Sequence, residues 1–138
     1  MLKRVLLSLI LAMPAAADTV TATRTIRANA IITETDVTLF NAAVPNGYQR
    51  IVDVVGQEAR VVLYPGRPIL VDDIGPPALV TRNQIVQVHF RANGVEITTE
   101  GRALERGAIG DRLRLMNLSS RATLFGQVQG DGSILVKQ

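Results

Sequence analysis

Few side chains in this sequence have types and spacings that could support catalysis or metal binding. The 138 residues include one histidine, His89, and no cysteine, which are too few ligands for a closed structural zinc site. A hydrolytic triad would also depend on His89, which falls on the polar face of an expected hairpin, and no Gly-x-Ser-x-Gly motif is present. Asp72 and Asp73 could form an acid pair or bind calcium, although solvated turn residues before Gly75-Pro76-Pro77 are the favoured interpretation. We therefore predict no enzyme activity, no cofactor and no metal site.

Three apolar residues are better candidates for binding a protein partner. Tyr64 stands at the edge of an expected Pro65-Gly66 turn, and Val62 belongs to the apolar run before that turn. Phe125 lies in an expected strand whose neighbouring residues face the core, which leaves Phe125 on the other side. An exposed aromatic side chain can anchor an interface, whereas a second layer of structure over Phe125 is the alternative. Val62, Tyr64 and Phe125 are thus the predicted partner-binding residues.

Residues 56–75 show how these side chains are positioned. Val61 and Leu63 alternate with their neighbours at the period of a half-buried strand. Pro65-Gly66 suits a type II turn, because proline presets φ at its second position and glycine accepts a positive φ at its third. A second strand is expected from Pro68, so the segment is predicted to be strand, turn and strand.

A sequence similarity with an offset of 37 residues links 29–37 to 66–74. The matched pairs are Ile32 with Ile69, Asp36 with Asp73, and Val37 with Ile74. In the first copy, Thr33 and Asp36 have the spacing of a capping box for one helical turn. We expect a small β fold that uses the same entry into a strand twice. Tyr48–Val55 is ambiguous between a short helix and a loop.

The remainder of the chain reads as an antiparallel meander. Gln84–Ala92 and Val95–Gly101 are joined by Asn93-Gly94, a strong signal for a two-residue hairpin. This register places four apolar residues on a core face: Val86, Val88, Phe90 and Ile97. Three further strands are expected, at Arg112–Asn117, Ala122–Gln129 and Ser133–Lys137. The chain is predicted to be mainly β, with at most two short helices and a boundary at Gly75-Pro76-Pro77.

Residues 1–17 have the layout of a secretory signal peptide. Two basic residues precede the apolar run Val5–Met13, and small residues then offer a cleavage site before Asp18. The apolar run is too short to cross about 30 Å of hydrocarbon, so no stable membrane insertion is expected after cleavage. Loss of these two basic residues changes 15 basic and 12 acidic residues to 13 and 12, so the high sequence pI is weak evidence for nucleic-acid binding and no nucleic-acid partner is expected.

The order and spacing of several segments resemble a known family, the flagellar basal-body P-ring formation (assembly) proteins. These are periplasmic chaperones that contain an SAF (β-clip) domain. The segments that carry the resemblance are Thr23–Ile26, Ile31–Val37, Val55–Arg60, Leu63–Ile69, Gly107–Asn117, Ser119-Ser120 and Gly126–Val128. Together they extend over nearly all of the chain after the signal peptide.

The resemblance implies an SAF-like β-clip part at 18–78 and an antiparallel β-meander, barrel-like part at 79–138. It implies a periplasmic chaperone that binds the flagellar P-ring subunit and assists its assembly around the rod, with no catalysis and no cofactor. Longer members of the family carry an extra N-terminal domain that this sequence is expected to lack. Asn29 stands where SAF domains commonly have glycine, and asparagine tolerates the same left-handed conformation.

Two other functions stay open at this point. A periplasmic SAF module could bind carbohydrate such as peptidoglycan, although the sequence has no tryptophan and offers only Tyr48 and Tyr64 as tyrosine platforms. A component of pilus assembly could use a similar SAF domain, and only the C-terminal part of the sequence separates it from the flagellar interpretation.

Overall fold

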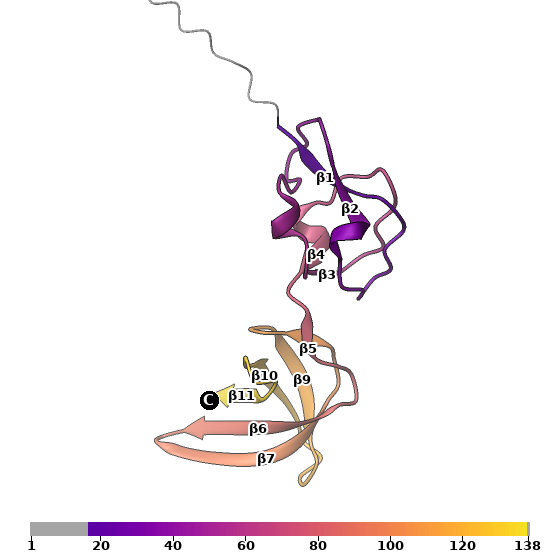
Figure 1. Ribbon diagram of the computed structural model, residues 1–138. Helices are drawn as coiled ribbons and strands as arrows, with labels where there is room; N and C mark the ends of the chain where they lie inside the picture. The colour runs from indigo at the N-terminus through magenta and orange to yellow at the C-terminus, as the bar shows by residue number, and fades with distance from the viewer. Residues whose placement is uncertain (1–16, 138) are drawn as a thin grey trace, which may run out of the picture.

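The computed structural model describes residues 17–137, so nearly all of the expected signal peptide lies outside the described residues. Within this range the chain is mainly β, and each helical segment is one 3₁₀ turn. Figure 1 shows two lobes joined by the chain between β4 and β5. We call residues 17–77 the N-terminal half and residues 78–137 the C-terminal half. None of the described helical turns is long and apolar enough to cross a membrane.

The N-terminal half consists of short strands and 3₁₀ turns. Its elements are β1 (Thr19–Ala22), η1 (Glu34–Asp36), β2 (Val37–Phe40), η2 (Ile51–Asp53), β3 (Glu58–Ala59), η3 (Val71–Asp73) and β4 (Ile74–Gly75). β1 pairs with β2 and β3 pairs with β4, both antiparallel. At most two short helices were predicted, whereas the described residues contain three 3₁₀ turns. The additional turn, η3, forms because the second copy of the sequence repeat adopts the same turn as the first.

The two copies of the repeat form interlocked, equivalent structures. Ile26 and Leu63, which are 37 residues apart, exchange main-chain hydrogen bonds of 2.9 Å in both directions. The pairing of Ala22 with Val37 in β1–β2 recurs as the pairing of Ala59 with Ile74 in β3–β4. The prediction that one strand-entry device is used twice is therefore confirmed.

Each copy also begins with a residue in the left-handed conformation. Asn29 has φ 66° and Gly66, its counterpart, has φ 77°. Asparagine thus takes over the conformation expected of a glycine. In the first copy, the Asp36 carboxylate accepts bonds from the Thr33 amide at 3.0 Å and the Thr33 hydroxyl at 2.8 Å. This confirms the single capped turn predicted there.

The predicted strands on either side of Pro65-Gly66 are wrong in extent. Leu63 and Pro68 make only isolated bridges, to Ile26 and Thr21 respectively, and neither belongs to a continuous strand. Val61, expected on the half-buried face with Leu63, is 46% exposed, whereas Leu63 is buried. The isolated bridge orients Leu63 and the residue on either side of it, but the alternation does not extend as far as Val61.

The core of the N-terminal half is aliphatic. Its buried members are Val20, Ala22, Ile26, Ile32, Val37, Val54, Ala59, Leu63, Ile69 and Ile74. The ambiguous segment Tyr48–Val55 forms a single 3₁₀ turn, and Val54, the C-cap residue that follows this turn, joins the core. Residues 51–53 of that segment thus fit the helix alternative, and the rest of the segment fits the loop alternative.

The C-terminal half is built on a closed barrel with longer strands. Its elements are β5 (Ala78–Val80), β6 (Ile85–Ala92), β7 (Val95–Ala103), β8 (Gly107–Ala108), β9 (Arg112–Asn117), β10 (Thr123–Val128) and β11 (Ile134–Lys137). The barrel order is β10-β11-β6-β7-β9, and the pairing of β9 with β10 closes it. The pairing of β11 with β6 is parallel, whereas the other barrel pairings are antiparallel. β5 pairs separately with β8.

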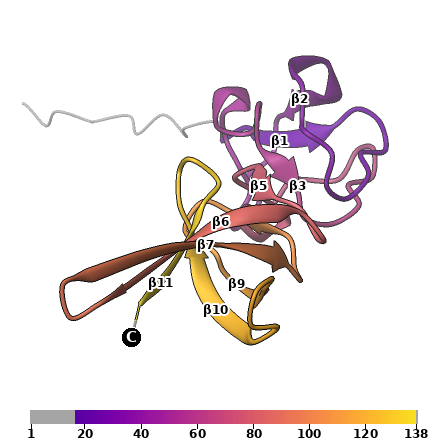
Figure 2. The same cartoon turned by 90° about the horizontal axis from the view of Figure 1, so that it is seen from below.

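The β6–β7 hairpin has the register predicted from Asn93-Gly94, with Arg91 opposite Glu96 and Phe90 opposite Ile97. Val86 and Val88 are buried in the barrel core as expected. Ile97, however, is 54% exposed, which contradicts its placement in the core. Figure 2 shows that the β6–β7 hairpin, which carries Ile97, extends past the rest of the barrel.

Candidate functional site

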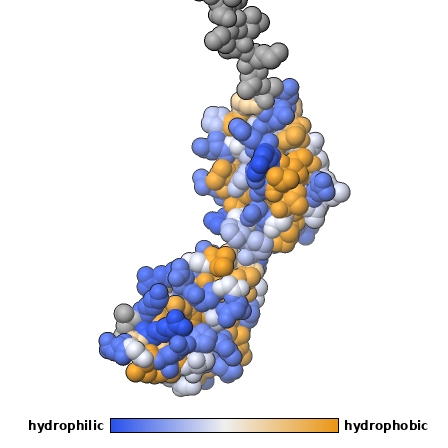
Figure 3. Space-filling model, turned by 60° about the vertical axis from the view of Figure 1, so that its left-hand side comes forward, coloured by the Kyte–Doolittle hydropathy of each residue, from blue (hydrophilic) through white to orange (hydrophobic). Residues whose placement is uncertain are grey.

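The predicted residues Val62 and Tyr64 line one groove in the N-terminal half. The groove has a volume of about 420 Å³. Its lining consists of Val44, Val61, Val62, Leu63, Tyr64, Arg67, Pro68, Leu70 and Asp73. Val62 is 41% exposed and Tyr64 is 54% exposed, so both offer apolar area to a partner. Figure 3 shows apolar side chains gathered on one side of this lobe.

The backbone explains why these two side chains face outward. Leu63, between them, is held by Ile26 and buried, and alternate side chains of an extended segment point to opposite sides. The Arg67 amide donates to the Tyr64 carbonyl at 3.2 Å, which closes the turn over Gly66. The far wall is fixed by the bridge of Leu70 to Gly47. The groove therefore lies between two segments that are both anchored to the core.

Several lining residues were not predicted. Val44 comes from a distant loop, and Pro68 and Leu70 come from the second arm of the turn. Their apolar character was visible in the sequence, but only the folded chain shows that they share a surface. Val61, predicted to be half-buried, adds apolar area to this groove instead.

Phe125 lies on the other half of the molecule. It is 53% exposed, so no second layer built from residues 17–137 covers it. The Arg112 guanidinium lies over the ring, 5.2 Å from its centroid, in a cation–π contact. The structure therefore brings Val62 and Tyr64 together but assigns Phe125 to a separate surface of the C-terminal half.

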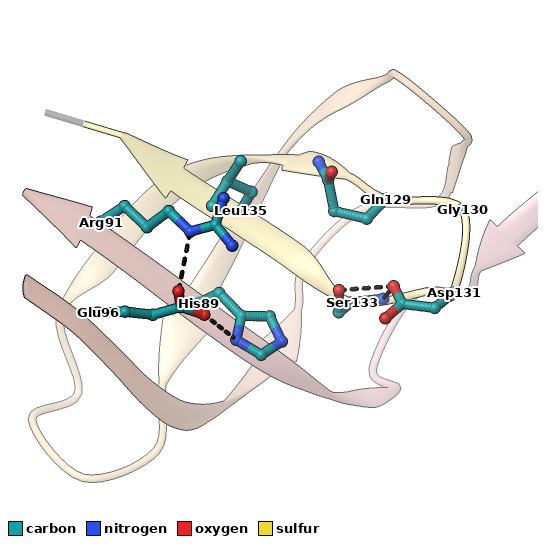
Figure 4. A pocket seen from close by; sticks show the side chains of 8 residues that line it. All are labelled: His89, Arg91, Glu96, Gln129, Gly130, Asp131, Ser133 and Leu135. Atoms are coloured by element: carbon teal, nitrogen blue, oxygen red, sulfur yellow. Dashed lines mark hydrogen bonds and ion pairs between the residues drawn. The ribbon is translucent and has the colours of Figure 1, made fainter. Parts of the chain in front are cut away.

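A polar hollow next to His89 contains residue types found in hydrolases, but not their arrangement (Figure 4). The His89 Nδ1 lies 3.2 Å from the Thr98 hydroxyl and 3.5 Å from the Glu96 carboxylate. The Ser133 hydroxyl donates directly to Asp131 at 2.6 Å. A triad needs the imidazole between hydroxyl and carboxylate. Within residues 17–137, histidine and serine are instead held by different partners.

The candidate metal ligands are also dispersed. Asp73 accepts a bond from the Leu70 amide at 3.1 Å and closes the turn η3. Among the described residues, no group of three or more histidine, cysteine or acidic side chains could hold a metal ion. Asp72 and Asp73 both lie in the turn η3, the position favoured from the sequence.

An ion pair connects the two halves. The Arg106 guanidinium donates to the Glu58 carboxylate at 2.6 Å, and the Ala78 amide donates to the same carboxylate at 3.0 Å. Burial by itself raises the pKa of Glu58, but these bonds from Arg106 and Ala78, together with the charge of Arg60, outweigh it and lower the pKa. Sequence reasoning missed this pair because its residues are 48 positions apart.

Fold and site together define a class of protein. The molecule is a mainly β protein in which an SAF-like (β-clip) half precedes a closed, mostly antiparallel barrel, and its exposed groove is mainly apolar. The family model described as "Chaperone for flagella basal body P-ring formation" matches residues 17–136. The chain belongs to this family, as the resemblance in the sequence predicted.

Individual relatives agree with this assignment. The chain is 33% identical over 101 residues to the flagellar protein FlgA of Rhizobium meliloti strain 1021, which covers 72% of this chain and 60% of the relative. It is 30% identical over 101 residues to FlgA of Agrobacterium fabrum, covering 72% and 62% respectively. The chain thus spans about 60% of the length of the curated relatives it matches.

Solved structures support the fold. The crystal structure of Salmonella FlgA in open form has a TM-score of 0.74 at 25% identity, covering 88% of this chain and 60% of that one. The crystal structure of FlgA from Thermotoga maritima has a TM-score of 0.61 at 26% identity, covering 88% and 45%.

Proposed function

We propose that this chain is a periplasmic, non-enzymatic chaperone that binds the flagellar P-ring subunit and assists its assembly. Membership of the P-ring formation family supports the process. The observation that carries the binding mode is the groove in which Val62 and Tyr64 stand exposed. A chaperone must hold its client without trapping it, and an exposed apolar groove suits reversible contact.

The groove supplies apolar area with few fixed polar groups. Its exposed valines and Tyr64 can bury surface at about 25 cal/mol per Å² against a complementary client surface. Arg67 and Asp73 provide charges at its margin. We propose Val62 and Tyr64 as the main contacts and Phe125 as a second contact on the C-terminal half.

We also propose that the halves are separate domains, with the boundary near residue 78. Each has its own buried cluster, the first ending at Ile74 and the second beginning at Val80. The segment Gly75-Pro76-Pro77 between them is the expected site of mobility. Both domains could then contact one client in sequence.

The experiment is affinity measurement between residues 18–138 and the P-ring subunit of the same host. Val62→Lys should weaken binding about tenfold or more, because it places a charge in an apolar contact. Val52→Lys is the matched control, since Val52 is 74% exposed in the same half and does not line the groove. Phe125→Glu tests the second contact, with Phe40→Glu as its control.

Each result decides something definite. Loss of affinity in Val62→Lys alone places the main contact in the groove. Unchanged affinity in both Val62→Lys and Phe125→Glu rejects both surfaces. If the wild-type chain does not bind the ring subunit but binds peptidoglycan fragments saturably, the chaperone proposal gives way to the carbohydrate-binding alternative.

A further inference from the structure

The outer part of β7 is an open sheet edge. β7 pairs with β9 only from Gly101 onward. Within the described chain, residues 95–100 pair with β6 and with no other strand. Figure 1 shows the β6–β7 hairpin projecting from the barrel with β7 as its free outer margin.

Alternate residues of this edge have main-chain groups that are free to form hydrogen bonds with a partner. The two-residue turn makes Ala92 and Val95 the first hydrogen-bonded pair, so alternate residues of β7 direct their amide and carbonyl groups away from β6. Those residues are Glu96 and Thr98, followed by Glu100. The Glu100 carbonyl accepts a hydrogen bond from the Leu118 amide at 3.0 Å. This bond confirms that the main-chain groups of Glu100 point away from β6.

The side chains of the edge form two different faces. On the inner face, Val95 is 59% exposed and Ile97 is 54% exposed. On the outer face stand Glu96, which bonds Arg91 at 3.1 Å, and Glu100, which forms no ion pair among the described residues. Natural edges are commonly blocked by proline, lysine or a bulge. Residues 95–100 contain none of these.

The carboxylates of Glu96 and Glu100 favour a basic occupant of this edge. Two copies of this chain paired edge to edge about Thr98 would set Glu96 of each directly opposite Glu100 of the other, and facing like charges destabilise a strand pair. We infer that the free main-chain groups of the β7 edge, on Glu96 and Thr98, accept an extended segment of a partner protein as an added strand. That segment carries apolar side chains toward Val95 and Ile97, and lysine or arginine beside Glu96 and Glu100.

The inference deepens the proposed function and rests on it for the identity of the partner. The main-chain contacts of the edge would hold a client segment, while the groove would hold a folded apolar surface. The chemistry of the edge itself does not depend on which client is used, so the two ideas can be tested separately.

The test compares Thr98→Pro with Thr98→Val. Proline removes an amide that points away from β6, a position where an edge strand tolerates it, whereas valine keeps that amide. Both variants lose the Thr98–His89 contact, so only the amide and the ring differ. Circular dichroism first establishes that both are folded, and affinity for the P-ring subunit is then measured. We expect Thr98→Pro to bind about tenfold more weakly than Thr98→Val.

Amide hydrogen exchange provides a readout that needs no substitution. With saturating ring subunit, the amides of Glu96 and Thr98 should become protected by about tenfold or more. Equal affinities of the two Thr98 variants, or unchanged exchange at these amides in the complex, would overturn the inference even if Val62→Lys confirms the groove. If the ring subunit does not bind at all, a short peptide of alternating lysine and valine is the probe, and absence of protection by it overturns the inference as well.

Discussion

The two halves of this molecule are held together in different ways. The C-terminal half relies on continuous ladders, as in the pairing of β6 with β7 over eight residues on each side. The N-terminal half relies on short pairs, isolated bridges and capped turns, such as the mutual bonds of Ile26 and Leu63. The difference teaches that a duplicated set of local turns can replace a regular sheet, provided that their apolar residues meet in one core.

The first way to test this comparison is to damage one core at a time. Ile69→Ala in the N-terminal core and Leu115→Ala in the barrel core should each cost about 2–5 kcal/mol, because both side chains are fully buried. Hydrogen exchange should report lost protection mainly in the half that carries the substitution. Leu79→Ala, at a 41% exposed site, is the control. Equal loss of protection in both halves would show a single cooperative unit.

The second test compares the two copies of the repeat. Asp36 is buried and is bonded to Thr33 and to Arg24 at 2.6 Å, whereas Asp73 accepts from the Leu70 amide. Asp36→Asn should therefore cost about 1–3 kcal/mol, and Asp73→Asn about 0.5–1 kcal/mol. Urea unfolding measures both. Similar costs would contradict the idea that the first turn is the more strongly fixed.

Asp36 also makes stability depend on pH. Burial raises the pKa of its carboxyl, but the bonds from the Thr33 amide and hydroxyl and from Arg24 exceed that effect and leave the pKa below its usual value. A lowered pKa in the folded state means that the stabilisation is present above about pH 3.9, the ordinary pKa of aspartate, and is lost as pH falls through the folded pKa. As the pH is lowered below about 3.9, the urea midpoint of Asp36→Asn should therefore fall less steeply than that of the wild type.

The third test removes the link between the halves. Glu58→Gln should cost about 1–2 kcal/mol, because the amide keeps one acceptor but loses the charge facing Arg106. The pKa of Glu58 is lowered, so its contribution should be present above about pH 4.3 and disappear at lower pH. Arg106→Gln should reproduce the lost pH dependence. If the stability of either variant depended on pH as steeply as that of the wild type, the ion pair would not stabilise the junction.

The smallest expected effects concern the paired left-handed residues. Gly66→Ala should cost about 1 kcal/mol through its positive φ alone, since no atom lies within 4 Å of an added Cβ. Asn29→Gly should change stability by about 0.5 kcal/mol or less, because both residues accept φ 66°. Thermal unfolding of both variants measures this. A large cost for Asn29→Gly would reveal a side-chain role that the repeat does not share.

Several features of the fold follow from the sequence over a few residues. Asn93-Gly94 predicted the hairpin and its register, the Thr33–Asp36 spacing predicted the capped turn, and the offset of 37 residues predicted a repeated device. These predictions succeeded because turn conformation and capping depend on the φ preferences and short side chains of adjacent residues. The order of segments also sufficed to identify the family.

Tertiary structure alone decided which apolar residues are buried and which distant groups meet. Val61 and Ile97 follow regular alternation, yet both are exposed, because one lies beside an isolated bridge and the other extends past the barrel. The groove joins Val44 to Tyr64, and the junction joins Glu58 to Arg106. Alternation specifies only that two faces differ. Whether another segment covers a face depends on contacts between residues far apart in the chain, which local preferences do not encode.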